Sequence, residues 1–117
     1  MIASTSTHMF EEAADAARAV RTQFEPNAEK APTLGKVLRE MHPRAVVTCA
    51  RGSSDHAATF AKYLIETRAG ALTSSAAPSV SSVYAAQPDL RDTLFIAISQ
   101  SGKSPGLLAS TQRARKA

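Results

Sequence analysis

The sequence predicts an α/β fold, with a parallel sheet between helices in a three-layer sandwich and a helical lead-in before it. Two observations carry this prediction. From residue 45 onward, short apolar runs alternate with amphipathic stretches, which is the pattern of strand–helix–strand units with right-handed crossovers. Before residue 45 the apolar residues show only helical spacing. We therefore expect a lead-in over residues 1–44 and an α/β domain over residues 45–117.

The lead-in is expected to contain two helices. Apolar residues recur at intervals of three and four from Met9 to Phe24, and Pro26-Asn27 should break that pattern. A second, shorter amphipathic helix is expected over residues 34–41. It should end at His42, because the residue before a proline is biased out of the helical region.

The first strand of the α/β domain is expected at Ala45–Ala50, a short apolar and β-branched run. A Gly/Ser-rich turn follows, and then a helical stretch that should stop at Gly70. Residues 71–76 predict a weaker strand, and residues 78–88 favour one or two helical turns.

The clearest strand is expected at Thr93–Ile98, followed by a second Gly/Ser-rich turn. A last helix should begin at Pro105, with Ser104 as its N-cap, because proline is favoured at the first helical position. Three strands are few for such a sheet, so we expect this chain to be the N-terminal portion of a longer protein.

The formal net charge of +4 raises the question of a nucleic-acid partner. Basic residues are interleaved with acidic ones along the chain, and the only dense cluster is Arg113, Arg115 and Lys116, with no aromatic residues among them. A solvated basic end explains this cluster better than a nucleic-acid interface, so we expect no nucleic-acid binding.

The single cysteine, Cys49, excludes an internal disulfide and is expected to be buried in its apolar run. No His or Cys pair has metal-ligand spacing, so no metal or cofactor is predicted. There is no signal peptide and no apolar run long enough to cross a membrane, which predicts a cytoplasmic protein.

The stretch "AISQSGKS", residues 97–104, ends like a nucleotide-binding P-loop but does not fit one. That motif needs a glycine five positions before Gly102, where this chain has Ala97. Ala97 also lies inside the predicted strand, so the loop is too short to wrap around a triphosphate. The sequence therefore argues against ATP binding.

The two Gly/Ser-rich turns are expected to meet. In a flavodoxin-like sheet the first and third strands are neighbours and their helices lie on opposite faces, which opens a crevice at the carboxyl ends of the strands. Hydroxyl groups and free N–H groups at two helix starts suit a phosphate monoester such as a sugar phosphate. Serines also cap helices commonly, but two such turns on adjacent strands favour a ligand site. The candidate residues are Gly52, Ser53, Ser54, Ser99, Gln100, Ser101 and Ser104.

These motifs identify a family resemblance. "CARGSSDHAATFAKYLIE" and "AISQSGKSPGLLAS" resemble the two phosphate-binding motifs of the sugar isomerase (SIS) domain, and "THMFEEAADAARAV" is similar to the helical lead-in before a first SIS domain. The resemblance implies a flavodoxin-like SIS fold, here a first SIS domain that is incomplete at its C-terminus. It implies that Ser53, Ser54, Ser99, Gln100 and Ser101 bind the sugar phosphate, and that Ser104 replaces a threonine usual in the family.

The family chemistry is ring opening, proton transfer between C1 and C2, and exchange of an amine on C2. The glutamate, histidine and lysine that perform it in the family lie in a second SIS domain or a partner subunit. The resemblance therefore implies no catalytic residue in this chain, binding without turnover by the chain alone, and a homodimer.

Two features favour the deaminase branch of the family, which converts glucosamine 6-phosphate to fructose 6-phosphate and ammonia. The short tail before the first helix leaves no room for the glutaminase domain of the synthases, and Lys103-Ser104-Pro105 departs from their usual Glu-Thr. Two alternatives stay open: the isomerase part of glutamine–fructose-6-phosphate aminotransferase, and a non-catalytic SIS sensor of sugar phosphates.

Three further residues have both a functional and an ordinary interpretation. Arg51 could supply charge to the phosphate or form a surface salt bridge, and Lys103 could do the same or point to solvent. His56 could touch substrate, but a partly exposed histidine at a helix start is the more ordinary interpretation.

Overall fold

The sheet is parallel and three-stranded. The computed structural model describes residues 7–117, in which β1 (Ala45–Ala50), β2 (Thr73–Ser75) and β3 (Thr93–Ile98) form one sheet in the order β2-β1-β3. Val46 of the central strand lies opposite Thr73 on one side and Leu94 on the other. This order places the ends of β1 and β3 side by side, as the flavodoxin-like arrangement predicts.

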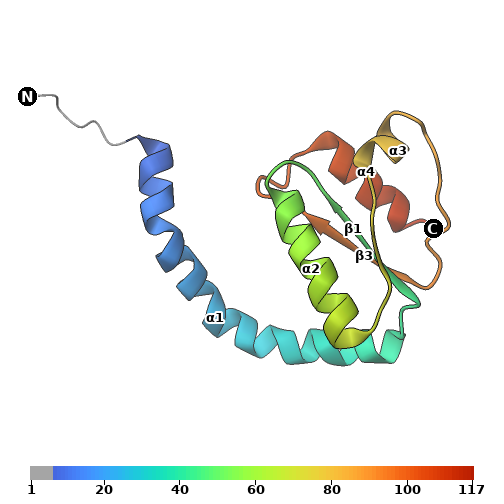
Figure 1. Cartoon of the computed structure of the whole chain (residues 1–117), viewed down its shortest axis with the longest axis horizontal. Helices are drawn as coiled ribbons and strands as arrows, with labels where there is room; N and C mark the ends of the chain where they lie inside the picture. Colours follow the sequence, from blue (N-terminus) through green and yellow to red (C-terminus); the bar gives the residue numbers. More distant parts are fainter. Residues whose placement is uncertain (1–6) are drawn as a thin grey trace, which may run out of the picture. The chain divides into compact units, whose positions relative to one another are not determined.

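Helices cover both faces of this sheet (Figure 1). α2 (Ser54–Ala69) packs against all three strands from one side, while α4 (Pro105–Ala114) packs against β1, β3 and the short α3 (Pro78–Ser82). α2 ends at Gly70, whose φ of 67° is the left-handed conformation that only glycine adopts without cost. The α/β part of the chain is therefore a three-layer sandwich.

The core is centred on β1. The buried residues of β1 are small or of moderate size. Among the buried residues of α2 and α4, only Leu107 is a large apolar residue, so the core is small. The buried apolar residues are Val46, Cys49, Ala50, Ala58 and Leu107. The buried polar residues Thr73 and Ser110 have hydrogen bonds to backbone carbonyls, so their burial leaves no polar group unpaired.

Cys49 lies within this core and should be chemically inert in the folded protein. Its side chain is fully buried, and burial raises the pKa of the thiol above its ordinary value, while the nearby Ser110 hydroxyl acts in the opposite direction. Since the thiolate is the reactive form, labelling of native protein by a disulfide reagent should be at least about 100-fold slower than labelling of unfolded protein. The difference should persist as the pH rises above neutral, because the raised pKa delays deprotonation of the thiol in the folded protein.

The measurement is the absorbance of the released thiol anion at matched reagent concentrations, in buffer and in concentrated denaturant. Because the chain has one cysteine, a single equivalent reports on β1 alone. Complete labelling of native protein within minutes would show that β1 opens readily and would contradict this packing.

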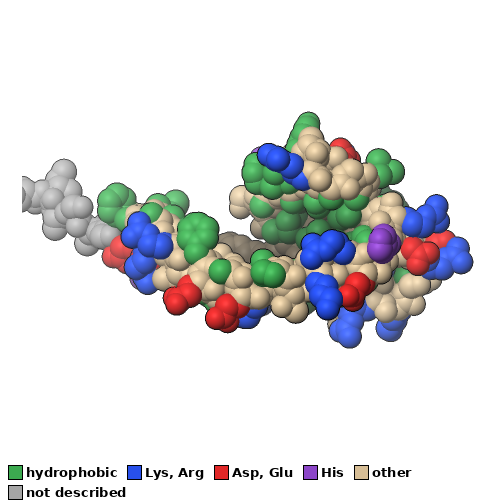
Figure 2. Space-filling model, turned by 90° about the horizontal axis from the view of Figure 1, so that it is seen from below, with side chains coloured by type: hydrophobic (Ala, Val, Ile, Leu, Met, Phe, Trp, Pro, Cys, Tyr) green, Lys and Arg blue, Asp and Glu red, His purple; other side chains and the backbone are tan. Residues whose placement is uncertain are grey.

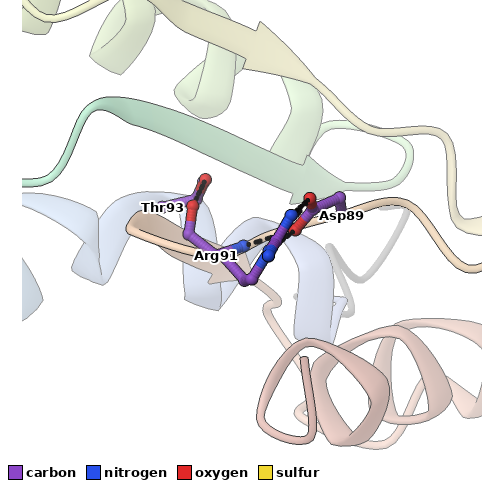
Figure 3. A network of polar contacts seen from close by, with 3 residues as sticks. All are labelled: Asp89, Arg91 and Thr93. Atoms are coloured by element: carbon purple, nitrogen blue, oxygen red, sulfur yellow. Dashed lines mark hydrogen bonds and ion pairs between the residues drawn. The ribbon is translucent and has the colours of Figure 1, made fainter.

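The segment before β3 is ordered by a local polar network (Figure 3). The Asp89 carboxylate accepts hydrogen bonds from the Arg91 backbone N–H at 3.1 Å and from the Arg91 guanidinium at 2.9 Å, and the Thr93 hydroxyl donates to the Arg91 carbonyl at 3.2 Å. The Arg44 N–H donates to the Asp92 carbonyl at 2.8 Å, which ties the start of β3 to the start of β1. The two strands thus begin in register, and their opposite ends reach the same edge.

The lead-in corrects the prediction of two helices. α1 (His8–Met41) is one helix of 34 residues that contains Pro26 and Pro32. A proline inside a helix removes one hydrogen bond and clashes with the preceding turn, which bends a helix when good helix formers continue on both sides. Figure 1 shows this bend along α1. The helix ends one residue before the predicted His42, which takes a left-handed φ of 45°.

α1 buries none of its described residues, and its large apolar side chains lie at the surface (Figure 2). Phe10 and Phe24, for example, are each 68% exposed. The described chain divides between Glu40 and Met41 into two compact units, of which the second carries the sheet. No helix within residues 7–117 has both the length and the hydrophobicity that crossing a membrane requires.

Candidate functional site

A cavity of about 200 Å³ lies at the carboxyl ends of β1 and β3. It contains every residue that the sequence proposed as a phosphate ligand, drawn from two turns far apart in the chain. Its lining residues are Arg51, Gly52, Ser53, Ser54, Ile98, Ser99, Gln100, Ser101, Ser104 and Leu107. The fold therefore brings the two serine-rich turns together around one space.

The first turn connects β1 to α2. Gly52 has a φ of 59°, and no heavy atom lies within 4 Å of where a Cβ would be, so glycine is needed here for its backbone conformation and not for space. The turn closes with hydrogen bonds from the N–H of Asp55 to the Gly52 carbonyl at 3.1 Å and from the N–H of His56 to the Ser53 carbonyl at 3.2 Å. Within the described chain, the N–H groups of Ser53 and Ser54 have no acceptor, so both can serve an anion.

The second turn connects β3 to α4 and is held by its own serines. The Ser99 hydroxyl accepts from the Gly102 N–H at 2.9 Å, and the Ser101 hydroxyl accepts from the Lys103 N–H at 3.2 Å. Each hydroxyl oxygen is thus anchored to the loop, while its own proton stays available for donation. Preorganised donors of this kind lose little conformational entropy when a ligand binds.

The two serines at helix N-caps do not act as caps. Ser53 precedes α2 and Ser104 precedes α4, yet neither side chain makes a capping hydrogen bond. Serine at an N-cap usually accepts a bond from the second or third N–H of its helix. Helix capping therefore does not account for either serine, and both residues line the cavity.

The cavity has a positive electrostatic character. Its lining contains no Asp or Glu, and Arg51 is its single ionisable side chain. The N-termini of α2 and α4 add partial positive charge at the same place. A site of hydroxyl, amide and guanidinium donors suits an anion, and its lining has no carboxylate or imidazole that could act as a general base.

Of the three further residues that the sequence offered as possible ligands, only one lines the cavity. Arg51 lines the cavity, whereas Lys103 and His56 do not and are exposed. Ile98 and Leu107 also line the cavity, although the sequence analysis did not predict them as site residues. Their signal was present, because Ile98 is the last residue of the clearest strand and Leu107 is an apolar residue in the first turn of the last helix.

A larger cavity of about 480 Å³ lies elsewhere in the α/β part of the chain, over the α4 face of the sheet. This larger cavity is lined by apolar side chains and by residues from the end of the chain. The apolar residues include Val47, Val80, Leu90 and Phe95. The smaller cavity is the better candidate for the phosphate, because both serine-rich turns and the N-termini of two helices line it. Among residues 7–117, no three His, Cys, Asp or Glu side chains are grouped as metal ligands would be.

Comparison with solved structures finds a close relative of this fold. The chain matches the crystal structure of a "putative phosphosugar isomerase" from Silicibacter pomeroyi DSS-3 with a TM-score of 0.81 and 40% sequence identity. The match covers 87% of this chain and 31% of the other, so the chain spans about a third of that protein's length. No protein-family model matches the sequence, and no curated protein does.

The predicted fold class is confirmed. A parallel sheet in the order β2-β1-β3, covered by helices on both faces and preceded by a helix, is the flavodoxin-like SIS arrangement.

Proposed function

We propose that this chain is the sugar-phosphate-binding part of an SIS-type isomerase that deaminates glucosamine 6-phosphate to fructose 6-phosphate and ammonia. The observation that carries the proposal is the cavity, in which two turns present serine hydroxyls, a glutamine amide and unpaired N–H groups around one space without any carboxylate. The similarity to a structure described as a phosphosugar isomerase supports the same class of ligand.

The cavity would hold the substrate by its phosphate. Ser53, Ser54 and Ser101 donate to the phosphate oxygens, and Gln100 has an amide that can contact either the phosphate or a sugar hydroxyl. Fixing the phosphate orients the C1 and C2 atoms relative to groups elsewhere in the protein, which lowers the entropic part of the barrier.

Proton transfer between C1 and C2 needs a base, and no residue of the cavity can act as one. The proposal therefore assigns the acid–base groups to another part of the protein or to a partner subunit in a homodimer. Mixing subunits with different site substitutions, and measuring the activity recovered, would test whether the site is shared.

The test is an assay of the full-length native protein with glucosamine 6-phosphate, in which ammonia and fructose 6-phosphate are both measured. Equal amounts of the two products are expected. Amination of fructose 6-phosphate that depends on glutamine would indicate the synthase reaction, and binding without turnover of any hexosamine phosphate would indicate a sensor. Absence of both binding and turnover would refute the proposal.

A further inference from the structure

We propose that Arg51 makes this site selective for a doubly charged phosphate monoester over a singly charged or neutral sugar. The inference rests on the proposed function and adds a residue that determines specificity. Arg51 responds to the charge of the ligand, whereas the serine hydroxyls bind the phosphate oxygens at defined positions.

The Arg51 guanidinium lies between elements that belong to the two turns. Arg51 follows β1 and lines the cavity beside Gly52 and Ser53. Its Nη1 lies 3.8 Å from the point where a Cβ on Gly106 would be, so the guanidinium lies against the first turn of α4. The Arg51 side chain therefore extends from the turn after β1 to the start of the helix after β3, where Pro78 and Ser82 of α3 also lie.

The position of the Arg51 guanidinium is electrostatically unfavourable unless an anion is present. The N-terminus of α4 carries partial positive charge, and a cation next to it is repelled. Arg51 makes no ion pair with any described residue, and the lining offers no carboxylate. An arginine in a structural role usually has an acidic partner, whereas this one is placed to receive its counter-charge from a ligand.

Neutral hydrogen-bond donors discriminate poorly between a phosphate dianion and a monoanion, whereas a full positive charge discriminates well. Hydroxyls and N–H groups are neutral donors, so their attraction to an anion depends less on its net charge than the attraction of a full cation does. A fixed positive charge attracts a dianion about twice as strongly as a monoanion at the same distance. Arg51 is the one lining side chain that carries a full positive charge, so it makes the largest single contribution to distinguishing these ligands by charge.

The test compares three ligands that differ in charge at O6: glucosamine 6-phosphate, glucosamine 6-sulfate and glucosamine. Calorimetry on the full chain should show that Arg51→Gln weakens binding of the phosphate by about 10- to 100-fold, as expected for a charge-assisted hydrogen bond. The same substitution should weaken binding of the sulfate by only about 3- to 10-fold, because its charge is half as large. Arg51→Lys should restore part of the preference.

Lys103→Gln is the matched control. It removes the same charge from the neighbouring turn, but its side chain lies outside the cavity lining, so a loss of less than about threefold is expected for either ligand. Unfolding curves of the variants should match that of the parent chain, because Arg51 and Lys103 are both exposed.

Two results would overturn the assignment of Arg51 alone. One is a loss for Arg51→Gln no larger than that for Lys103→Gln, and the other is an equal loss for phosphate and sulfate. Failure of the parent chain to bind glucosamine 6-phosphate at all would instead refute the proposed function, and the inference with it.

Discussion

Ser101→Asp is expected to abolish binding of glucosamine 6-phosphate. The substitution places a carboxylate in a cavity that has none, next to where the phosphate would lie. One pair of like unit charges about 4 Å apart costs about 4 kcal/mol at an effective dielectric constant of about 20, so an affinity loss of at least about 100-fold is expected. Isothermal titration calorimetry with glucosamine 6-phosphate measures this loss.

The fold should tolerate this change. Ser101 is exposed, and an aspartate at its position can accept the hydrogen bond that the Lys103 N–H now donates to the serine hydroxyl. Gln112→Glu is the control, because it adds the same charge on an exposed position of α4 outside the cavity. Binding that survives Ser101→Asp with the parent affinity would place the phosphate elsewhere and contradict the assigned site.

Leu107→Ala should be the most destabilising single truncation of α4. Leu107 is 5% exposed and is the largest apolar side chain of the core. Removing a buried leucine costs its transfer free energy and leaves a cavity, so the free energy of unfolding should fall by about 2–5 kcal/mol. Circular dichroism during denaturant unfolding measures the change, and sugar-phosphate affinity should fall with it because Leu107 also lines the site.

The adjacent residue provides the control for this prediction. Leu108 is 49% exposed, so Leu108→Ala removes the same atoms from the same helix with little loss of burial, at a cost of less than about 1 kcal/mol. Equal destabilisation by the two variants would show that α4 packs on the sheet through a different face.

The strands and the two turns could be predicted because their signals are local. Apolar β-branched runs indicate buried strands, and Gly-Ser-Ser and Ser-Gln-Ser-Gly each combine a residue for left-handed backbone with hydroxyl donors. That the turns meet also followed from the sequence, once a parallel sheet of this order was assumed. The prediction of two helices in place of α1 was wrong, because whether a proline ends a helix or only bends it depends on the residues that continue on both sides.

The sequence by itself determined which residues form strands, where the turns lie and which donor groups they carry. Only the tertiary structure decided that Ser53 and Ser104 leave their helices uncapped, and that Arg51 enters the cavity while Lys103 stays outside it. The physical reason is that backbone preference and donor chemistry belong to single residues and their neighbours. The direction of a side chain and the charge around it are set by atoms that the sheet brings together from distant parts of the chain.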